Sequence, residues 1–278
     1  MSWRRLARRY VPYALRWRAR LALRVADDAR SGLRIAKTRA APEVYPHLVC
    51  RYERPLICYE GQEASFPNKR NNVELALAGI DGLLIEPSET FSFWRCVGRP
   101  ARARGYRLAA AIKDAVLTQD VGGAICLVST LLYNVGLLGG LTIVERRCHS
   151  VDSYGERRYF ELGRDAAVEH PYLDLRFRND LGTPLLLRAY PEAERVVAEA
   201  WSAAPLGLCV QIDVDVDASD GLLRARTRRA VRRDGHRREE DLGWSTHLVP
   251  DSRHFGLLDT MEGRAETTPK RTHGDDET

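Results

Sequence analysis

The stretch VGGAICLVSTLLYN, residues Val121–Asn134, places a glycine pair and one cysteine directly before an apolar run with helical spacing. Residues that would share one face of this helix are apolar, which predicts a buried helix beginning near Cys126; they are Val128, Leu131, Leu132, Val135 and Leu138. The first N–H groups of a helix have no partner within it, and the helix dipole places partial positive charge there. Cys126 is therefore either a thiolate nucleophile or a small buried core residue.

The residues beside Cys126 favour acyl-transfer chemistry. Gly122 and Gly123 let the chain turn sharply and let a substrate approach the backbone. The N–H groups at the start of the helix are suited to stabilising an oxyanion. We therefore predict that the substrate or oxyanion site is formed by Gly122, Gly123, Leu127 and Ser129.

A nucleophilic cysteine needs a base, and the base needs a group that orients it. The segment VERRCHS supplies His149; as a strand, it would carry Glu145, Arg147 and His149 on one face. Cys148 would then point to the opposite face, so no shared metal site is expected there. Arg147 is expected to disfavour the imidazolium and keep the ring neutral. Asp165 in LGRDAAV, predicted at the start of the next strand, is the candidate orienting group.

The order of the predicted elements indicates an α+β fold, with helices first and a mostly antiparallel sheet after them. Composition divides the chain into five parts: residues 1–40 (a basic helical extension), 41–68 (an irregular, proline-containing lead-in), 69–205 (the core domain), 206–250 (carboxy-terminal strands packed on the core) and 251–278 (a polar, disordered tail).

Within the core, a helix is predicted from Asn71. The stretch YRLAAAIKDAVLTQD fits either a helix or a hairpin around Lys113 and Asp114. NDLGTP is a strong turn signal between two strands. Further on, Val210, Ile212 and Val214 alternate with polar residues, as in a strand with one buried face.

The amino-terminal extension has apolar residues at helical spacing with arginines between them, namely Trp3, Leu6, Tyr10, Tyr13, Trp17 and Leu21. Pro12 is expected to break or restart the helix. Two interpretations remain open: the helix packs its aromatic stripe on the core, or residues 1–38 lie on an anionic membrane surface. Arginines interrupt every apolar run that could serve as a signal peptide, and no run approaches the ~20 residues of a membrane span. A cytoplasmic location is expected, with peripheral contact at the inner membrane face under the second interpretation.

The 278-residue chain is 44% hydrophobic and 29% charged, which is typical of a folded protein. Its formal charge of +5 comes almost entirely from arginine, and no recognition motif accompanies it, so no specific nucleic-acid partner is expected. Six scattered cysteines without a CxxC pair indicate neither a disulfide scaffold nor a zinc site. No cofactor is implied, and the oligomeric state is not indicated.

Several ordered motifs agree with one known family. IEPSETFSFW, GGAICLVSTLLYN, LTIVERRCHS, GRDAAV and LDLRFRND follow one another along the chain. Together they resemble the VanW family, which is named for a protein encoded in vancomycin-resistance clusters. The resemblance runs from about Asn71 to Trp201, and the basic extension and overall length are similar to those of the free-standing members.

The resemblance implies a cysteine enzyme, because some exported members are described as L,D-transpeptidases that cross-link peptidoglycan through an acyl-enzyme. Cys126 would then be the nucleophile, His149 the base and Asp165 the orienting residue, with a peptide or other amide as substrate. The chain departs from the family pattern at Ala124 and Leu127, where the family usually has glycine and glutamine, and at Arg147, where it has histidine. These departures keep a second hypothesis open, a non-catalytic accessory or binding protein that retains the fold.

Overall fold

The computed structural model describes residues 11–113, 116–152 and 154–249. This part of the chain confirms the predicted α+β class. Its α-helices are α2 (Tyr13–Arg30), α3 (Phe66–Ala78), α4 (Phe93–Val97) and α5 (Cys126–Leu138). Its strands are β1 (His47–Pro55), β2 (Leu83–Ile85), β3 (Thr90–Ser92), β4 (Leu108–Lys113), β5 (Val116–Val121), β6 (Thr142–Glu145), β7 (Arg176–Arg178), β8 (Leu185–Glu192), β9 (Arg195–Ser202), β10 (Cys209–Ser219), β11 (Leu222–Arg233) and β12 (His236–Leu248).

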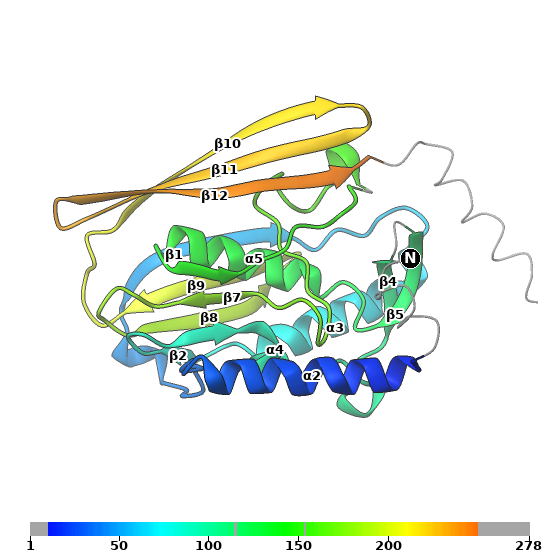
Figure 1. The fold of residues 1–278 in the computed structure, drawn as a ribbon, viewed down its shortest axis with the longest axis horizontal. Helices are drawn as coiled ribbons and strands as arrows, with labels where there is room; N and C mark the ends of the chain where they lie inside the picture. The colour runs from blue at the N-terminus through cyan, green and yellow to red at the C-terminus, as the bar shows by residue number, and fades with distance from the viewer. Residues whose placement is uncertain (1–10, 114–115, 153, 250–278) are drawn as a thin grey trace, which may run out of the picture.

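The helix α5 lies in the middle of the molecule, between two antiparallel sheets (Figure 1). One sheet has the strand order β1-β9-β8-β2, and the other has the order β10-β11-β12. Because both sides of the helix are covered, the whole stretch from Leu127 to Leu137 is buried. This explains why the helix is apolar nearly all round rather than along a single stripe.

Two smaller sheets complete the core. β3, β7 and β6 form one of them, and β4 and β5 form a hairpin in register from Leu108 opposite Val121 to Lys113 opposite Val116. The hairpin decides between the two interpretations of this stretch, although the turn residues 114–115 lie outside the described residues. The turn predicted at NDLGTP joins β7 to β8, and β10 shows the predicted alternation of half-buried and exposed residues.

Two predictions about the lead-in are wrong. The helix α3 begins at Phe66 rather than Asn71, because Pro67 occupies a first-turn position, where its missing N–H costs nothing. The stretch expected to be irregular also contains β1, which pairs with β9 along its full length, apart from one bulge. The lead-in therefore belongs to the central sheet.

The amino-terminal helix α2 begins directly after Pro12 and lies along the outside of the core (Figure 1). The ring of Trp17 lies 5.5 Å from the ring of His170, so one face of the helix packs on the core as the first interpretation predicts. Three of the predicted stripe residues, Trp3, Leu6 and Tyr10, lie outside the described residues, as does the tail 251–278. None of the helices in the described part of the chain combines the length and apolarity of a membrane span.

Candidate active site around Cys126

The loop before α5 is shaped by residues with almost no space around them. Gly122 has a φ of +86°, and a Cβ on Gly123 would lie 2.2 Å from the carbonyl oxygen of Ala109. Ala124 follows with a φ of +76°, a left-handed conformation that costs a non-glycine residue free energy. The glycine pair is therefore required by backbone geometry and close packing against the β4–β5 hairpin.

Two N–H groups of this loop are available to a ligand. Among the described residues, none accepts a hydrogen bond from the N–H of Ala124 or of Cys126. The N–H of Leu127, by contrast, donates to the carbonyl of Ala124 at 3.1 Å. Its side chain is 3% exposed and packs in the core, so Leu127 lies turned away from the loop surface.

The polar residues of α5 hold the segment that carries Asp165. Ser129 is fully buried, and its hydroxyl donates to the carbonyl of Ala166 at 2.6 Å. The side chain of Asn134 donates to the carbonyl of Arg164 at 2.8 Å and accepts from its guanidinium at 2.8 Å. The structure thus gives Ser129 a structural contact in place of the substrate contact predicted for it.

His149 and Asp165 form a tightly bonded pair. Nδ1 of His149 lies 2.6 Å from Oδ2 of Asp165, and the backbone N–H of His149 donates to the same oxygen at 2.6 Å. Arg146 donates to the other oxygen, Oδ1, at 2.8 Å. Burial alone would raise the pKa of Asp165, but His149 and Arg146 lower it to about 2. Asp165 is consequently a buried carboxylate that fixes the orientation of the ring.

The sulfur of Cys126 lies beside this ring. Burial alone would lower the pKa of His149, but hydrogen bonding to Asp165 and to Cys126 raises it to about 10. Since Nδ1 is engaged by Asp165, Nε2 is the nitrogen left to face the sulfur; it also lies 3.1 Å from the hydroxyl of Tyr159. The thiol itself points to the carbonyl oxygen of Val168 at 3.7 Å. The three residues predicted from the sequence are thus brought together.

Three expectations about the surroundings of His149 are wrong. The strand β6 ends at Glu145, so His149 lies in an irregular segment, and Asp165 does not begin a strand. The chain leaves the sheet because this segment bonds to the one carrying Asp165, for example through the N–H of Ala167 and the carbonyl of Arg147 at 2.8 Å. The side chain of Arg147 is exposed, and Asp165 dominates, so the imidazolium is favoured and not suppressed.

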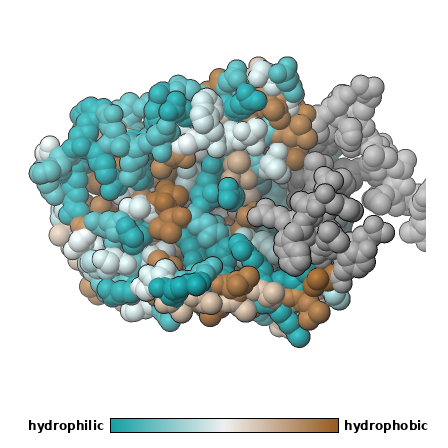
Figure 2. Space-filling model, viewed as in Figure 1, coloured by the Kyte–Doolittle hydropathy of each residue, from teal (hydrophilic) through white to brown (hydrophobic). Residues whose placement is uncertain are grey.

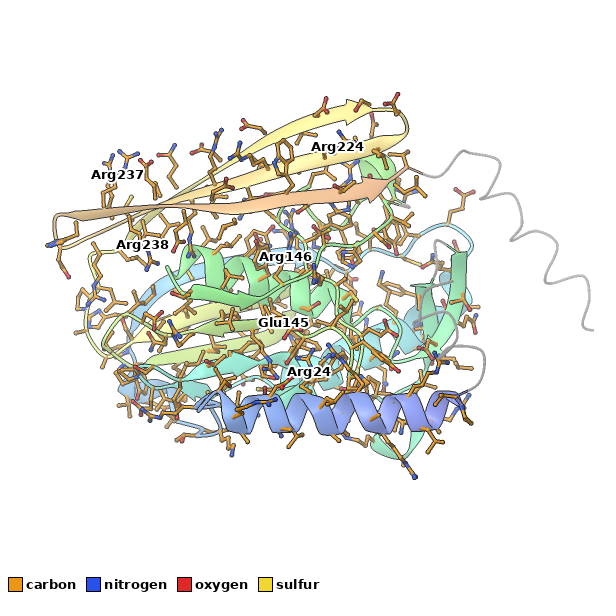
Figure 3. All side chains as sticks on the ribbon, viewed as in Figure 1. Arg24, Glu145, Arg146, Arg224, Arg237 and Arg238 are labelled. Carbon is orange, nitrogen blue, oxygen red and sulfur yellow. The ribbon has the colours of Figure 1, made fainter. Side chains whose placement is uncertain are left out.

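The sequence interpretation missed a contribution from β12. Arg146 lies between α5 and β12 (Figure 3), and its guanidinium donates to the hydroxyl of Ser245 at 2.7 Å. His247 is fully buried with its Nε2 3.7 Å from Asp165, and neither of its ring nitrogens has a hydrogen-bond partner in the described part of the chain. Burial lowers the pKa of His247, which keeps its ring neutral. The contribution of Ser245 and His247 to the site becomes visible only when β12, which is distant in sequence, packs beside Asp165.

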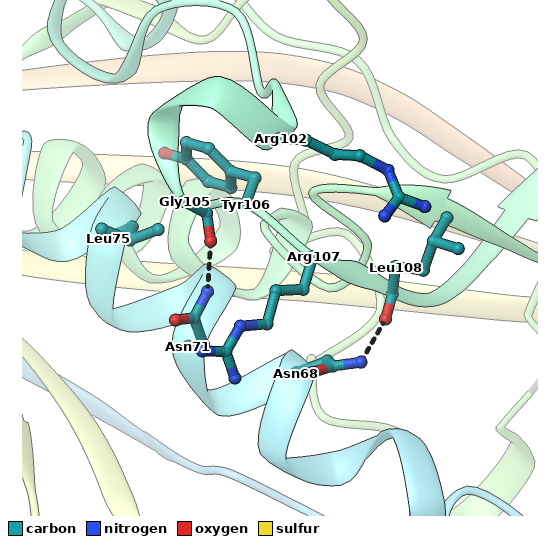
Figure 4. A pocket seen from close by; sticks show the side chains of 8 residues that line it. All are labelled: Asn68, Asn71, Leu75, Arg102, Gly105, Tyr106, Arg107 and Leu108. Atoms are coloured by element: carbon teal, nitrogen blue, oxygen red, sulfur yellow. Dashed lines mark hydrogen bonds between the residues drawn. The ribbon is translucent and has the colours of Figure 1, made fainter.

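A cavity of about 570 Å³ lies between α3 and the segment from Arg102 to Leu108 (Figure 4). Asn68, Asn71, Arg102 and Arg107 supply its polar groups, and Cys126 does not line it. The carbonyl of Arg107 accepts from the N–H of Gly122 at 3.0 Å, which fastens the cavity wall to the back of the loop. The cavity is therefore a neighbour of the cysteine site.

The described residues hold no cluster of three or more His, Cys, Asp or Glu side chains arranged for a metal ion. All six cysteines are free, and Cys126 is partly exposed. Cys126 is thus neither sealed in an apolar interior nor consumed by a disulfide, and it remains accessible for chemistry of its own.

Comparison with known proteins places this site in a family. Residues 68–201 match a family model described as "VanW like protein". The chain carries a VanW-family domain. Over 134 residues it is 38% identical to the "Uncharacterized protein YoaR" of Bacillus subtilis (strain 168). This match covers 46% of this chain and 43% of that protein.

The chain is also 34% identical over 136 residues to the "Vancomycin B-type resistance protein VanW" of Enterococcus faecalis (strain ATCC 700802 / V583). This match covers 49% of this chain and 50% of that protein. The chain thus spans about half the length of the curated relatives it matches. No solved structure matches it. The VanW-family range includes Cys126, His149 and Asp165, whereas Ser245 and His247 lie beyond it.

Proposed function

We propose that this VanW-family protein is a cysteine-dependent acyl-transfer enzyme, either a transpeptidase-like enzyme or an amide hydrolase. The observation that carries the proposal is the contact of His149 with Cys126 on one side and with Asp165, at 2.6 Å, on the other. A nucleophile, a base and an orienting carboxylate in that order are the parts that acyl transfer requires.

In the proposed reaction the proton of the Cys126 thiol resides on Nε2 of His149 at the start, because the raised pKa of the ring favours the imidazolium. The thiolate then attacks the amide carbon, and the carbonyl electrons move to the oxygen, which the N–H groups of Ala124 and Cys126 stabilise. When this intermediate collapses, the C–N bond breaks and the imidazolium gives its proton to the leaving amine. The resulting thioester on Cys126 is resolved by water in a hydrolase or by an acceptor amine in a transpeptidase.

The family supports the substrate class. One relative is named as a vancomycin resistance protein, and we propose that the substrate here is an amide in a peptide of the peptidoglycan type. The substitutions that depart from the family pattern are compatible with this proposed geometry. Leu127 is turned into the core and Arg147 is exposed, so neither side chain occupies the space beside the sulfur.

The decisive experiment is labelling of the full chain with iodoacetamide at neutral pH, followed by peptide mapping. We expect Cys126 to react at least ~10-fold faster than the same thiol in denatured protein, since His149 lies beside the sulfur as its proton acceptor. His149→Asn should abolish this advantage, whereas Cys209→Ser, which removes an exposed cysteine, should leave it unchanged.

A Cys126 that reacts no faster in the folded than in the denatured chain would contradict the proposal. That result would instead favour the accessory or binding role, for which the substitutions at Ala124, Leu127 and Arg147 are the motive. Release of an amine from a peptidoglycan-type peptide by the wild-type chain, absent in Cys126→Ser, would establish the reaction and the substrate class together.

A further inference from the structure

The helix α2 has one face that the core does not use. Its inward face is fixed by ion pairs: the guanidinium of Arg24 binds both carboxylate oxygens of Glu145 at 2.8 Å (Figure 3), and Asp28 receives two hydrogen bonds from Arg176 at 2.6 and 3.1 Å. Because these contacts set the rotation of the helix about its axis, they also determine which residues face outward.

The outward face is an apolar stripe. Leu15 is 54% exposed and Leu23 is 57% exposed, with Val25 at 45%. Between them lie small exposed residues, Ala19, Ala22 and Ala26, which continue the stripe at helical spacing. Figure 2 shows the corresponding tan and brown surface along the edge where Figure 1 places α2.

The charges along this stripe from Val11 to Ala26 have one sign; beyond it, exposed Asp27 pairs with Arg30 at the carboxy end of the helix. Arg18 and Arg20 are exposed on its two sides, and no described residue forms an ion pair with either. Residues 11–26 contain no acidic residue, and residues 1–10 add four arginines and no acid. Arginines that flank an exposed apolar stripe place their charged ends at the level of lipid headgroups while the stripe enters the upper acyl region.

We propose that the outward face of α2 docks on an anionic membrane surface, with Leu15, Leu23 and Val25 inserted and Arg18 and Arg20 bound to lipid phosphates. The charge complementarity selects an anionic bilayer over a neutral one. The docking needs no movement of α2, since the ion pairs to Glu145 and Arg176 are on the opposite face. It is independent of the chemistry at Cys126.

The test is co-sedimentation of the full chain with vesicles of phosphatidylglycerol and phosphatidylcholine, compared with phosphatidylcholine alone. Wild-type protein is expected to bind the anionic vesicles at least ~10-fold more strongly, and high salt should remove most of this preference. Leu23→Glu should weaken binding by about tenfold, because it places a charge in the inserted stripe.

Val216→Glu is the matched control, because Val216 is 51% exposed on β10 and the charge change is the same. It should bind as the wild type does. Equal sedimentation with both vesicle types, no binding to either, or equal losses in the two variants would each overturn the proposal. Replacement of Arg18 and Arg20 by glutamine should reduce the preference for anionic vesicles; an unchanged preference would also overturn it.

Discussion

The two sheets that enclose α5 stabilise it by different means. On the β1-β9-β8-β2 side, the contact is apolar, with Leu185, Leu187 and Val196 among the fully or almost fully buried residues. On the β10-β11-β12 side, buried polar groups predominate, namely Thr227, Arg229, Ser245 and His247. The first side contributes mainly hydrophobic burial, whereas the second contributes hydrogen bonds to the helix end and to the Asp165 network.

This difference has a functional meaning. The apolar side belongs largely to the VanW-family range, while the polar side lies beyond residue 201. The polar sheet nevertheless contacts the candidate site, since Ser245 bonds Arg146 and His247 lies beside Asp165. The residues proposed for chemistry and the residues that set their polar surroundings therefore come from separate parts of the chain.

The largest effect is expected at Asp165, where His149 and Arg146 of the VanW-family range meet His247 of the polar sheet. Asp165→Asn removes the carboxylate that holds the His149 ring and pairs with Arg146. We expect turnover to fall by about 10²–10⁴-fold, the range for loss of an orienting carboxylate, and the faster labelling of Cys126 relative to the denatured chain to be lost. The measurement is the labelling rate at neutral pH. A change of less than about twofold would show that Asp165 serves the scaffold alone.

The next effect concerns the attachment of the polar sheet. Arg229 is 1% exposed and donates to the carbonyls of Leu137 and Leu141 at the end of α5, at 3.0 and 2.9 Å. Arg229→Met would leave these carbonyls without this donor and leave Glu240 with Arg238 as its remaining arginine partner, so we expect the free energy of unfolding to fall by about 3 kcal/mol in urea denaturation.

Arg228→Met is the matched control on the same strand, because the Arg228 side chain is half exposed and pairs with Asp215 at the surface. It should cost less than about 1 kcal/mol. Equal losses of unfolding free energy in the two variants would mean that the buried contacts of Arg229 with α5 stabilise the protein no more than a surface ion pair does.

The His149–Asp165 pair gives a dependence on pH. The pKa of His149 is raised from 6.5 to about 10, so its contribution to stability is complete below pH 6.5 and is lost as the pH rises through about 10. The pKa of Asp165 is lowered from 3.8 to about 2, so its contribution is complete above pH 3.8 and is lost as the pH falls through about 2.

His149→Asn should therefore destabilise the protein most between pH 3.8 and 6.5, and the difference from wild type should shrink above about pH 10. Urea denaturation of both proteins across this range measures it. A difference that stays constant with pH would indicate that the ring contributes by packing on Phe160 and not by its charge.

The smallest effect is expected at Ala124. Its φ of +76° is strained for alanine, so Ala124→Gly should stabilise the protein by about 1 kcal/mol. Ala193→Gly is the control, because Ala193 has a φ of +53° in the distant β8–β9 turn. Both should raise Tm, but only Ala124→Gly should alter the labelling rate of Cys126. If Ala193→Gly also altered labelling, the labelling rate of Cys126 would not depend specifically on the geometry of the loop at Ala124.

The sequence predicts what local patterns control. The helix behind Cys126, the turn at NDLGTP and the alternation in β10 are confirmed, because each depends on spacing within a short segment. The course of the chain around His149 is not predictable in this way. It leaves the strand after Glu145 because of bonds to residues 165–167, which lie far along the chain.

The same limit applies to the site. Cys126, His149 and Asp165 could be proposed from motifs, and the structure brings them together. Nothing in the local sequence marks Ser245 and His247 as site residues. A polar residue in a strand is normally expected to be exposed, and the sequence pattern is the same when it is buried. The polar character of α5 at Ser129 and Asn134 is likewise explained only by the segment it binds.

The ion pairs between α2 and the core limit where this protein can be truncated for expression. Glu145, Asp174 and Arg176 lie at the seam between the amino-terminal helix and the sheet containing β6 and β7, and Arg24 and Asp28 neutralise them. A recombinant fragment cut to residues 68–201 would keep the three inner charges and lose both counterions, in addition to β1 and the polar sheet. Expression designs should therefore start before Tyr13 and extend past Leu248, so that the homologous segment is produced together with the elements that complete its interior.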